Sequence, residues 1–144
     1  MFDLRPMTVA DLPACLALWT GMDGITLFPA TDSIKGLDRY LTRNPGLSVV
    51  AFKDGQLVGA ALAGHDARRG YLHHVAVAVE YRRRGLGRTM VEWCLRALVN
   101  EGIGRCHIFV NAGNDAGKEF WRHVGWEERP GVHVMSVMTD PAKA

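Results

Sequence analysis

The chain has 144 residues, of which 48% are hydrophobic, and its 17 basic and 15 acidic side chains give a formal net charge of +2. This length and apolar content predict a single domain over residues 1–144 with a substantial core. So small a net charge argues against general affinity for nucleic acid, and the lack of any run of about 18 apolar residues argues against a membrane span.

The cysteines and the N-terminus indicate the cellular setting. Cys15, Cys94 and Cys106 lie far apart and form no CxxC pair, so the sequence predicts neither a zinc site nor a disulfide framework. The first residues lack the charged start and long apolar stretch of a signal peptide. We therefore expect free thiols, no bound metal and a cytoplasmic location.

Helical patterns dominate the first third of the chain. Residues 2–5 are typical of a short edge strand. Thr8 and Asp11 then resemble a capping box, and apolar residues recur at helical spacing from there up to Trp19. A second short helix is expected over residues 31–43.

Strands dominate the middle of the chain. Residues 47–52 and 57–63 flank an Asp-Gly dipeptide, which is a strong signal for a two-residue hairpin. A third strand is expected over residues 71–79, and helical periodicity follows over residues 85–99. The remaining predicted elements are a strand over 106–110, a helix over 115–123 and a strand over 132–138. The order βααβββαβαβ predicts an α/β fold, with a mixed sheet of six to seven strands and helices on both faces.

The most informative stretch is residues 75–88, Val-Ala-Val-Ala-Val-Glu-Tyr-Arg-Arg-Arg-Gly-Leu-Gly-Arg, where a basic turn with two glycines joins a strand to a helix. The first N–H groups of a helix lack internal partners and carry partial positive charge, so such a turn favours a phosphate ligand. Solvated arginines on a glycine turn are the alternative interpretation. The P-loop sequence and the third glycine of a dinucleotide fingerprint are both missing.

Two separated motifs resemble the GNAT superfamily of N-acetyltransferases. Arg82-x-x-Gly85-x-Gly87 is similar to the family's Gln/Arg-x-x-Gly-x-Gly/Ala motif. Residues 114–126, Asn-Asp-Ala-Gly-Lys-Glu-Phe-Trp-Arg-His-Val-Gly-Trp, are similar to the family's downstream segment, which runs from an asparagine to a glycine and an aromatic residue. The resemblance implies direct transfer of an acetyl group from acetyl-CoA to an amine in a ternary complex, without a metal or a covalent intermediate.

The resemblance also implies which residues bind the coenzyme. One strand pairs its backbone with the pantetheine arm and is splayed from its neighbour, the turn wraps the pyrophosphate, and an asparagine contacts the arm from the other side. The implied residues are Val75, Ala76, Val77, Arg82, Arg83, Arg84, Gly85, Leu86, Gly87, Arg88 and Asn114. For Asn114 a simple helix N-cap is the alternative role.

The sequence departs from the family pattern where proton transfer is expected. Many members place a general-acid tyrosine at the position of Trp121, whose indole donates a hydrogen bond but does not titrate. Core packing is the alternative role of Trp121. The glutamates of two protein-acetylating branches correspond to Tyr71 and Phe109, so neither carboxylate is present.

Histidines are the candidate replacements for these glutamates. Strand alternation predicts Tyr71, His73, Val75 and Val77 on one face of the sheet and His74 on the other. The face bearing Tyr71 is the catalytic one if the family register holds, which favours His73 as the base or proton relay. A structural role for His73, with proton removal through water, is the alternative.

The acceptor is the least specified part. The resemblance places its site against residues 19–40, where Asp23 and Asp32 could attract a cationic amine or could simply cap a turn and a helix. Phe109 and Trp121 replace residues associated with N-terminal acetylation, which favours a small-molecule amine over a protein N-terminus or lysine. A non-catalytic acyl-CoA-binding module is the alternative, and the oligomeric state is left open, a homodimer included.

Overall fold

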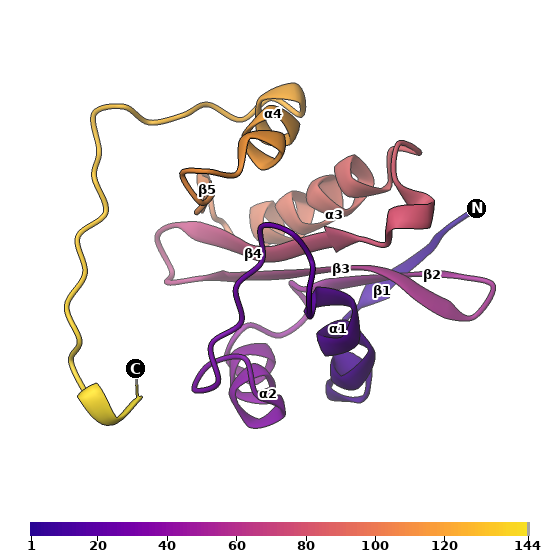
Figure 1. Cartoon of the computed structure of the whole chain (residues 1–144), viewed down its shortest axis with the longest axis horizontal. Coiled ribbons are helices and arrows are strands. Elements are labelled where there is room, and N and C mark those ends of the chain that lie inside the picture. The colour runs from indigo at the N-terminus through magenta and orange to yellow at the C-terminus, as the bar shows by residue number, and fades with distance from the viewer. Residues whose placement is uncertain (144) are drawn as a thin grey trace. The chain divides into compact units, whose positions relative to one another are not determined.

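The computed structural model describes residues 1–143 and divides into two compact units, Met1–Phe109 and a second that begins at Val110. The first unit holds a five-stranded sheet in the order β1-β2-β3-β4-β5 (Figure 1). Its strands are β1 (Asp3–Pro6), β2 (Val49–Lys53), β3 (Gln56–His65), β4 (Gly70–Val77) and β5 (Cys106–Ile108). Its helices are α1 (Leu12–Trp19), α2 (Ile34–Arg43) and α3 (Leu86–Asn100), with short 3-10 turns at η1 (Val9–Asp11) and η2 (Val79–Tyr81).

The sheet is mixed, as the sequence predicts. Strands β1 to β4 form an antiparallel meander, and α3 then crosses over so that β5 pairs parallel to β4. Helices α1 and α2 cover one face and α3 covers the other (Figure 1). The predicted α/β fold is therefore confirmed, although the sheet of the described residues has five strands rather than six to seven.

Local signals in the sequence account for two of the boundaries. Asp54 and Gly55 both have positive φ, 51° and 77°, which is the backbone of the tight hairpin turn that Asp-Gly favours. Helix α2 begins after Ser33, whose Oγ accepts a hydrogen bond from the Gly36 N–H at 3.0 Å.

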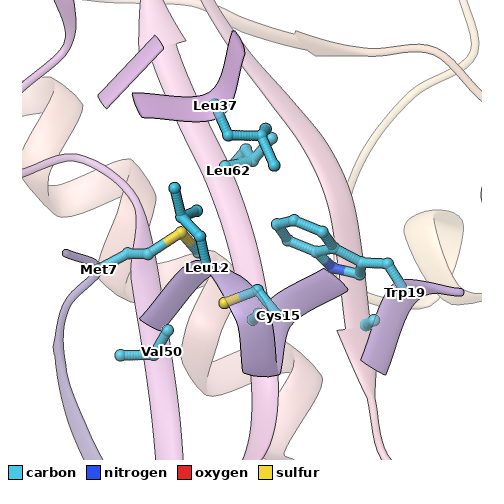
Figure 2. Packing of buried hydrophobic residues seen from close by; sticks show 9 residues of the cluster. Met7, Leu12, Cys15, Trp19, Leu37, Val50 and Leu62 are labelled. Atoms are coloured by element: carbon cyan, nitrogen blue, oxygen red, sulfur yellow. The ribbon is translucent and has the colours of Figure 1, made fainter. Parts of the chain in front are cut away.

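A hydrophobic cluster fixes α1 and α2 to the sheet (Figure 2). Each of its core members is at least nine-tenths buried. They are Met7, Leu12, Cys15, Trp19, Leu37, Val50, Ala60, Leu62 and Ala76. Burying a large apolar side chain of this kind contributes roughly 1.5–3 kcal/mol. This cluster defines the face of the sheet on which any acceptor site against α1 and α2 must lie.

Helix α3 lies close to the opposite face because two strand residues have no side chain. A Cβ on Gly59 would come within 2.8 Å of the Met90 sulfur, and a Cβ on Gly70 would come within 2.8 Å of Leu98. Leu86, at the first position of α3, is buried as well. The sheet therefore holds the start of α3 in place beside the end of β4.

The second unit contains α4 (Asp115–His123) and a short turn, η3 (Pro141–Lys143). Trp121 is buried and makes edge-to-face contacts with Phe120 and Trp126, with ring centroids 5.0 and 4.7 Å away. Within residues 1–143, none of the helices is long and apolar enough to cross a membrane.

The predicted strand over residues 132–138 is wrong. These residues are irregular in structure, and Val132, Val134, Met135, Val137 and Met138 are all more than half exposed. Valine-rich alternation signals a backbone suited to pairing, but a strand forms only against a partner strand. The described residues provide none for this segment.

Candidate active site

The turn between β4 and α3 has an unusual backbone. Arg83 (φ 64°) and Gly85 (φ 79°) are both in the left-handed region, and Gly85 is the N-cap of α3. The first helical amide with a partner inside the helix is that of Thr89, which donates to the Gly85 carbonyl at 3.0 Å. The amides of Leu86 and Gly87 precede it, so the helix start offers N–H groups to an anion.

The arginines of this turn divide into two roles. Arg82 reaches back, with Nε 3.2 Å from the Val77 carbonyl oxygen and a guanidinium nitrogen 2.9 Å from the Met22 sulfur. Its side chain therefore fastens the turn to the end of β4. Arg83 and Arg84 are exposed, the latter over the Tyr81 ring at 5.2 Å, and Arg88 is exposed on the first turn of α3. These residues surround the helix start with positive charge.

The parallel pairing of β4 with β5 covers only the first residues of β4. Their parallel pairing ends at Leu72 and Ile108. Beyond that point β4 continues to Val77, and no strand within residues 1–143 pairs with this edge of residues 73–77. The backbone of Val75, Ala76 and Val77 therefore lacks a partner on this edge among the described residues, and the splay of β4 from its neighbour stays a prediction.

The predicted faces of β4 are partly wrong, because the strand contains a bulge. Leu62 of β3 opposes His73, but Ala60 opposes Ala76, so β4 has one extra residue between the two pairs. The extra residue puts His74 at φ 52° and turns two successive side chains toward the same face. His74 thus lies on the face of His73, and after the bulge Ala76, rather than Val75 or Val77, continues that face.

His73 lies among aromatic rings on the face covered by α1 and α2. The Tyr71 and Phe109 rings are nearly parallel to it, with centroids 6.5 and 6.4 Å away, and the Tyr40 ring from α2 meets it edge-on at 6.2 Å. None of residues 1–143 hydrogen-bonds the His73 ring. Burial, and secondarily the nearby His74, lowers the pKa of His73 below its ordinary value, against the opposing influence of Asp32.

His74 is held by a pair that the sequence did not reveal. Its Nε2 lies 2.9 Å from Asp32 Oδ1, and the two side chains are only 16% and 9% exposed. The other Asp32 oxygen accepts the Phe28 N–H at 2.8 Å, and the His74 ring packs against Trp19 at 5.2 Å. Asp32 therefore ties the link between α1 and α2 to the bulge. It does not cap α2, a role that Ser33 has.

Two predicted site residues belong to the second unit. Asn114 is the N-cap of α4, where its Oδ1 accepts the Gly117 N–H at 2.9 Å. The helix-capping role, given above as the alternative to coenzyme binding, is therefore present. Trp121 occupies a packed position between two aromatic rings, which matches its alternative role as core.

The cysteines are unsuited to covalent catalysis. Burial raises the pKa of Cys15 and of Cys94 to about 12, and that of Cys106 to about 11. A thiol attacks as its thiolate, and at neutral pH almost none is present at such pKa values. Within residues 1–143, no group of three or more His, Cys, Asp or Glu side chains could hold a metal ion.

Comparison with known proteins agrees with this fold and identifies the family. The profile of the Acetyltransferase (GNAT) family matches residues 18–126. An acetyltransferase of Pectobacterium atrosepticum is 29% identical over 114 residues, which is 79% of each chain. The match covers well over half of the chain, so this protein belongs to the GNAT acetyltransferase family.

Solved structures share the fold at low identity. The PaiA N-acetyltransferase from Thermoplasma acidophilum, in complex with coenzyme A, is similar with a TM-score of 0.77 at 20% identity, over 88% of this chain and 90% of that one. An aminoglycoside acetyltransferase from an uncultured soil metagenomic sample, in complex with trehalose, has a TM-score of 0.72 at 16% identity, over 96% and 97% of the chains. At this identity the likeness concerns the fold and not the acceptor.

Proposed function

We propose that this chain transfers an acetyl group from acetyl-CoA to an amine, with the coenzyme held at the end of β4 and the following turn. The observation that carries this is the start of α3, where left-handed backbone at Arg83 and Gly85 gathers helix-start amides beside exposed arginines. Such a site fits a pyrophosphate in charge and in hydrogen-bond donors. The unpaired edge of β4 offers backbone groups to the pantetheine arm.

The family resemblance allows the proposed contacts to be named. The strand backbone contributes Val75, Ala76 and Val77, and the turn and helix start contribute Arg82, Arg83, Arg84, Gly85, Leu86, Gly87 and Arg88. Arg82 is proposed to act through its backbone, since its side chain already bonds the Val77 carbonyl. On α4, Asn114 is proposed to contact the arm and Trp121 to donate a hydrogen bond to the departing sulfur.

His73 is the proposed base. Acetyl-CoA supplies a thioester whose carbonyl carbon is open to attack by an amine. The amine nitrogen forms the C–N bond, the C–S bond breaks, and the thiolate leaves with the electron pair. His73 accepts the proton that the nitrogen loses, because its lowered pKa keeps the ring neutral at pH 7 and its nitrogens are unengaged within residues 1–143. Tyr71, stacked on the ring, holds its orientation.

The acceptor is proposed to be the amine of a small molecule. Tyr71 and Phe109 stand where the resemblance puts the glutamates of protein-acetylating branches, and their rings stack on one another at 6.2 Å. A carboxylate base on either strand is thereby replaced by an apolar surface.

Two measurements test this proposal. Calorimetry with acetyl-CoA measures coenzyme binding, and release of free CoA thiol across a panel of amines, amino acids and N-terminal peptides measures transfer. We expect binding, and thiol release with small amines. Binding without release for any acceptor would make the chain an acyl-CoA-binding module, release with peptides alone would move the acceptor to proteins, and absence of binding would remove the proposal.

A further inference from the structure

Five aromatic side chains gather where the pairing of β4 with β5 ends. Tyr71, His73 and Phe109 form a triangle with centroid distances of 6.2, 6.4 and 6.5 Å, and their planes differ by 7° to 17°. His107 is tilted against Tyr71 at 5.8 Å, and Tyr40 meets His73 edge-on. We refer to these five rings as the aromatic floor.

The aromatic floor lies at the end of the parallel pairing between β4 and β5. Tyr71 is paired with His107 across the last stretch of parallel pairing, whereas His73 and Phe109 are the first residues beyond it. The pantetheine arm is proposed to lie along β4 beyond this point, which brings the thioester at the end of the arm toward these rings. An acceptor that reacts there must then rest on or beside them. Phe109 is the last residue of the first unit, and the other residues of that unit leave at least 59% of it exposed.

The surroundings of His73 offer little exposed carboxylate to an acceptor. His73 is neutral at pH 7 because burial lowers its pKa. The charged groups that act on it are Asp32 and His74, and these are bonded to each other at 2.9 Å. The second Asp32 oxygen is occupied by the Phe28 N–H. The Asp32 carboxylate is thus hydrogen-bonded at both oxygens and only 9% exposed, which leaves little of it accessible to a second ammonium group of a ligand.

We propose that the aromatic floor selects an acceptor whose primary amine is carried on a flat apolar group, such as an arylalkylamine, rather than a polyamine or another polycation. Flat rings stack on flat rings at an offset or meet them edge-on, and each such contact contributes beyond its buried area. A ring resting on Phe109 and Tyr71 brings an amine one or two carbons away to His73. This inference rests on the proposed acetyl transfer, and it names the class of acceptor.

Three amines of similar reach test the inference on the wild-type chain: 2-phenylethylamine, 2-cyclohexylethylamine and 1,4-diaminobutane. With acetyl-CoA saturating, we expect kcat/KM for phenylethylamine to exceed that for the cyclohexyl compound about three- to tenfold, and that for the diamine by roughly tenfold or more. Equal values for the two ring amines, or a preference for the diamine, would overturn the inference.

The variant Phe109→Leu distinguishes recognition of the acceptor's ring from a general disturbance of the protein structure. It keeps an apolar side chain but removes the flat ring, so we expect KM for phenylethylamine to rise about three- to tenfold, with kcat nearly unchanged and the preference over the cyclohexyl amine lost. Val99→Ala, at an exposed position of α3, is the matched control and should leave all three amines unchanged. An equal loss with both ring amines in Phe109→Leu would assign Phe109 a structural role and overturn the inference.

The outcomes distinguish this inference from the function on which it rests. Acetyl-CoA binding with thiol release from the diamine or from peptides, but not from phenylethylamine, would overturn the acceptor class and leave the acetyl transfer standing. No thiol release with any amine would remove both.

Discussion

Two departures from regular backbone lie near the end of β4, a bulge within the strand and the turn that follows it, and they are built by different means. In the turn, left-handed backbone at Arg83 and Gly85 leads into the amides at the start of α3, and the Arg82 side chain fastens the turn to the end of β4. The bulge at His74 also has a left-handed residue, but Asp32 and Trp19, from distant parts of the chain, pack against it.

The difference shows how coenzyme binding and acceptor recognition can vary separately. A backbone cradle suits a ligand that is the same for every family member, since it depends on few side chains. The region around the bulge depends on particular rings and on one ion pair, so it can be changed for a new acceptor without loss of the coenzyme. Substitutions in the turn should therefore affect coenzyme binding, and those around the bulge should affect rate and acceptor use.

The largest effect is expected at His73. His73→Ala should lower the acetylation rate roughly 10²-fold or more, the usual scale for a general base, while acetyl-CoA affinity by calorimetry stays nearly constant. His73→Gln keeps a hydrogen-bonding group without a titrating one, so it should be impaired as well. A fully active His73→Ala enzyme would make the ring structural and pass proton removal to water.

The pH dependence of the rate sharpens the same test. In the wild type, kcat/KM should fall with falling pH because the amine becomes protonated, and should fall more steeply once His73 is protonated too. Burial lowers the pKa of His73 below the ordinary histidine value of about 6.5, so the steeper fall in kcat/KM should begin below about pH 6.5. His73→Ala should keep the amine limb and lose the steeper one.

The next effect is expected in the turn. Gly85→Asp should weaken acetyl-CoA binding by ~1–3 kcal/mol, because it places a carboxylate near the pyrophosphate. Gly85→Ala introduces the strain of a left-handed residue, about 1–2 kcal/mol in folding stability, and also a Cβ where the pyrophosphate is proposed to approach the backbone. Gly55→Ala is the matched control, since Gly55 has nearly the same φ, +77°, and equally open space around it. Both alanine variants should lose stability, and calorimetry should find weaker coenzyme binding only at Gly85.

A smaller effect, on stability, is expected at the bulge. His74→Ala or Asp32→Ala should lower the free energy of unfolding by ~1–3 kcal/mol, because each removes one partner of a largely buried hydrogen-bonded pair. The double variant should lose less than the sum, which denaturant titration of all four proteins measures. His74→Asn should recover part of the loss, since asparagine tolerates left-handed backbone. Strict additivity of the two single changes would show that the pair is not coupled.

The turn could be predicted from the sequence because its causes are local. A strand, the arginines, the glycines and a helix start follow one another within residues 75–88, and each residue type acts on its own backbone. The fold class was predictable for the same reason, from periodicity and hairpin signals.

The bulge could not be predicted, since its causes are distant. Alternation assumes a regular pleat, and nothing in a His-His pair signals an extra residue or a left-handed φ. The Asp32 partner lies 42 residues away along the chain, so pairing became visible only in the folded structure. The strand predicted over residues 132–138 was wrong for the opposite reason. The β propensity of these residues is a local signal, but a strand forms only when a distant partner strand is present.

The smallest effect is expected from salt, and it tests how far the cradle depends on its backbone. Raising the ionic strength from about 0.05 to about 0.5 M should weaken acetyl-CoA binding only about three- to tenfold, because screening reduces the contribution of exposed arginines and leaves directional amide contacts in place. Arg83→Ala, which removes one exposed charge, should make the salt dependence shallower and keep most of the affinity at high salt. Complete loss of wild-type binding near physiological ionic strength would instead indicate that charge alone attracts the coenzyme. The claim that the turn binds it through backbone amides, in contrast to the side chains that build the bulge, would then be wrong.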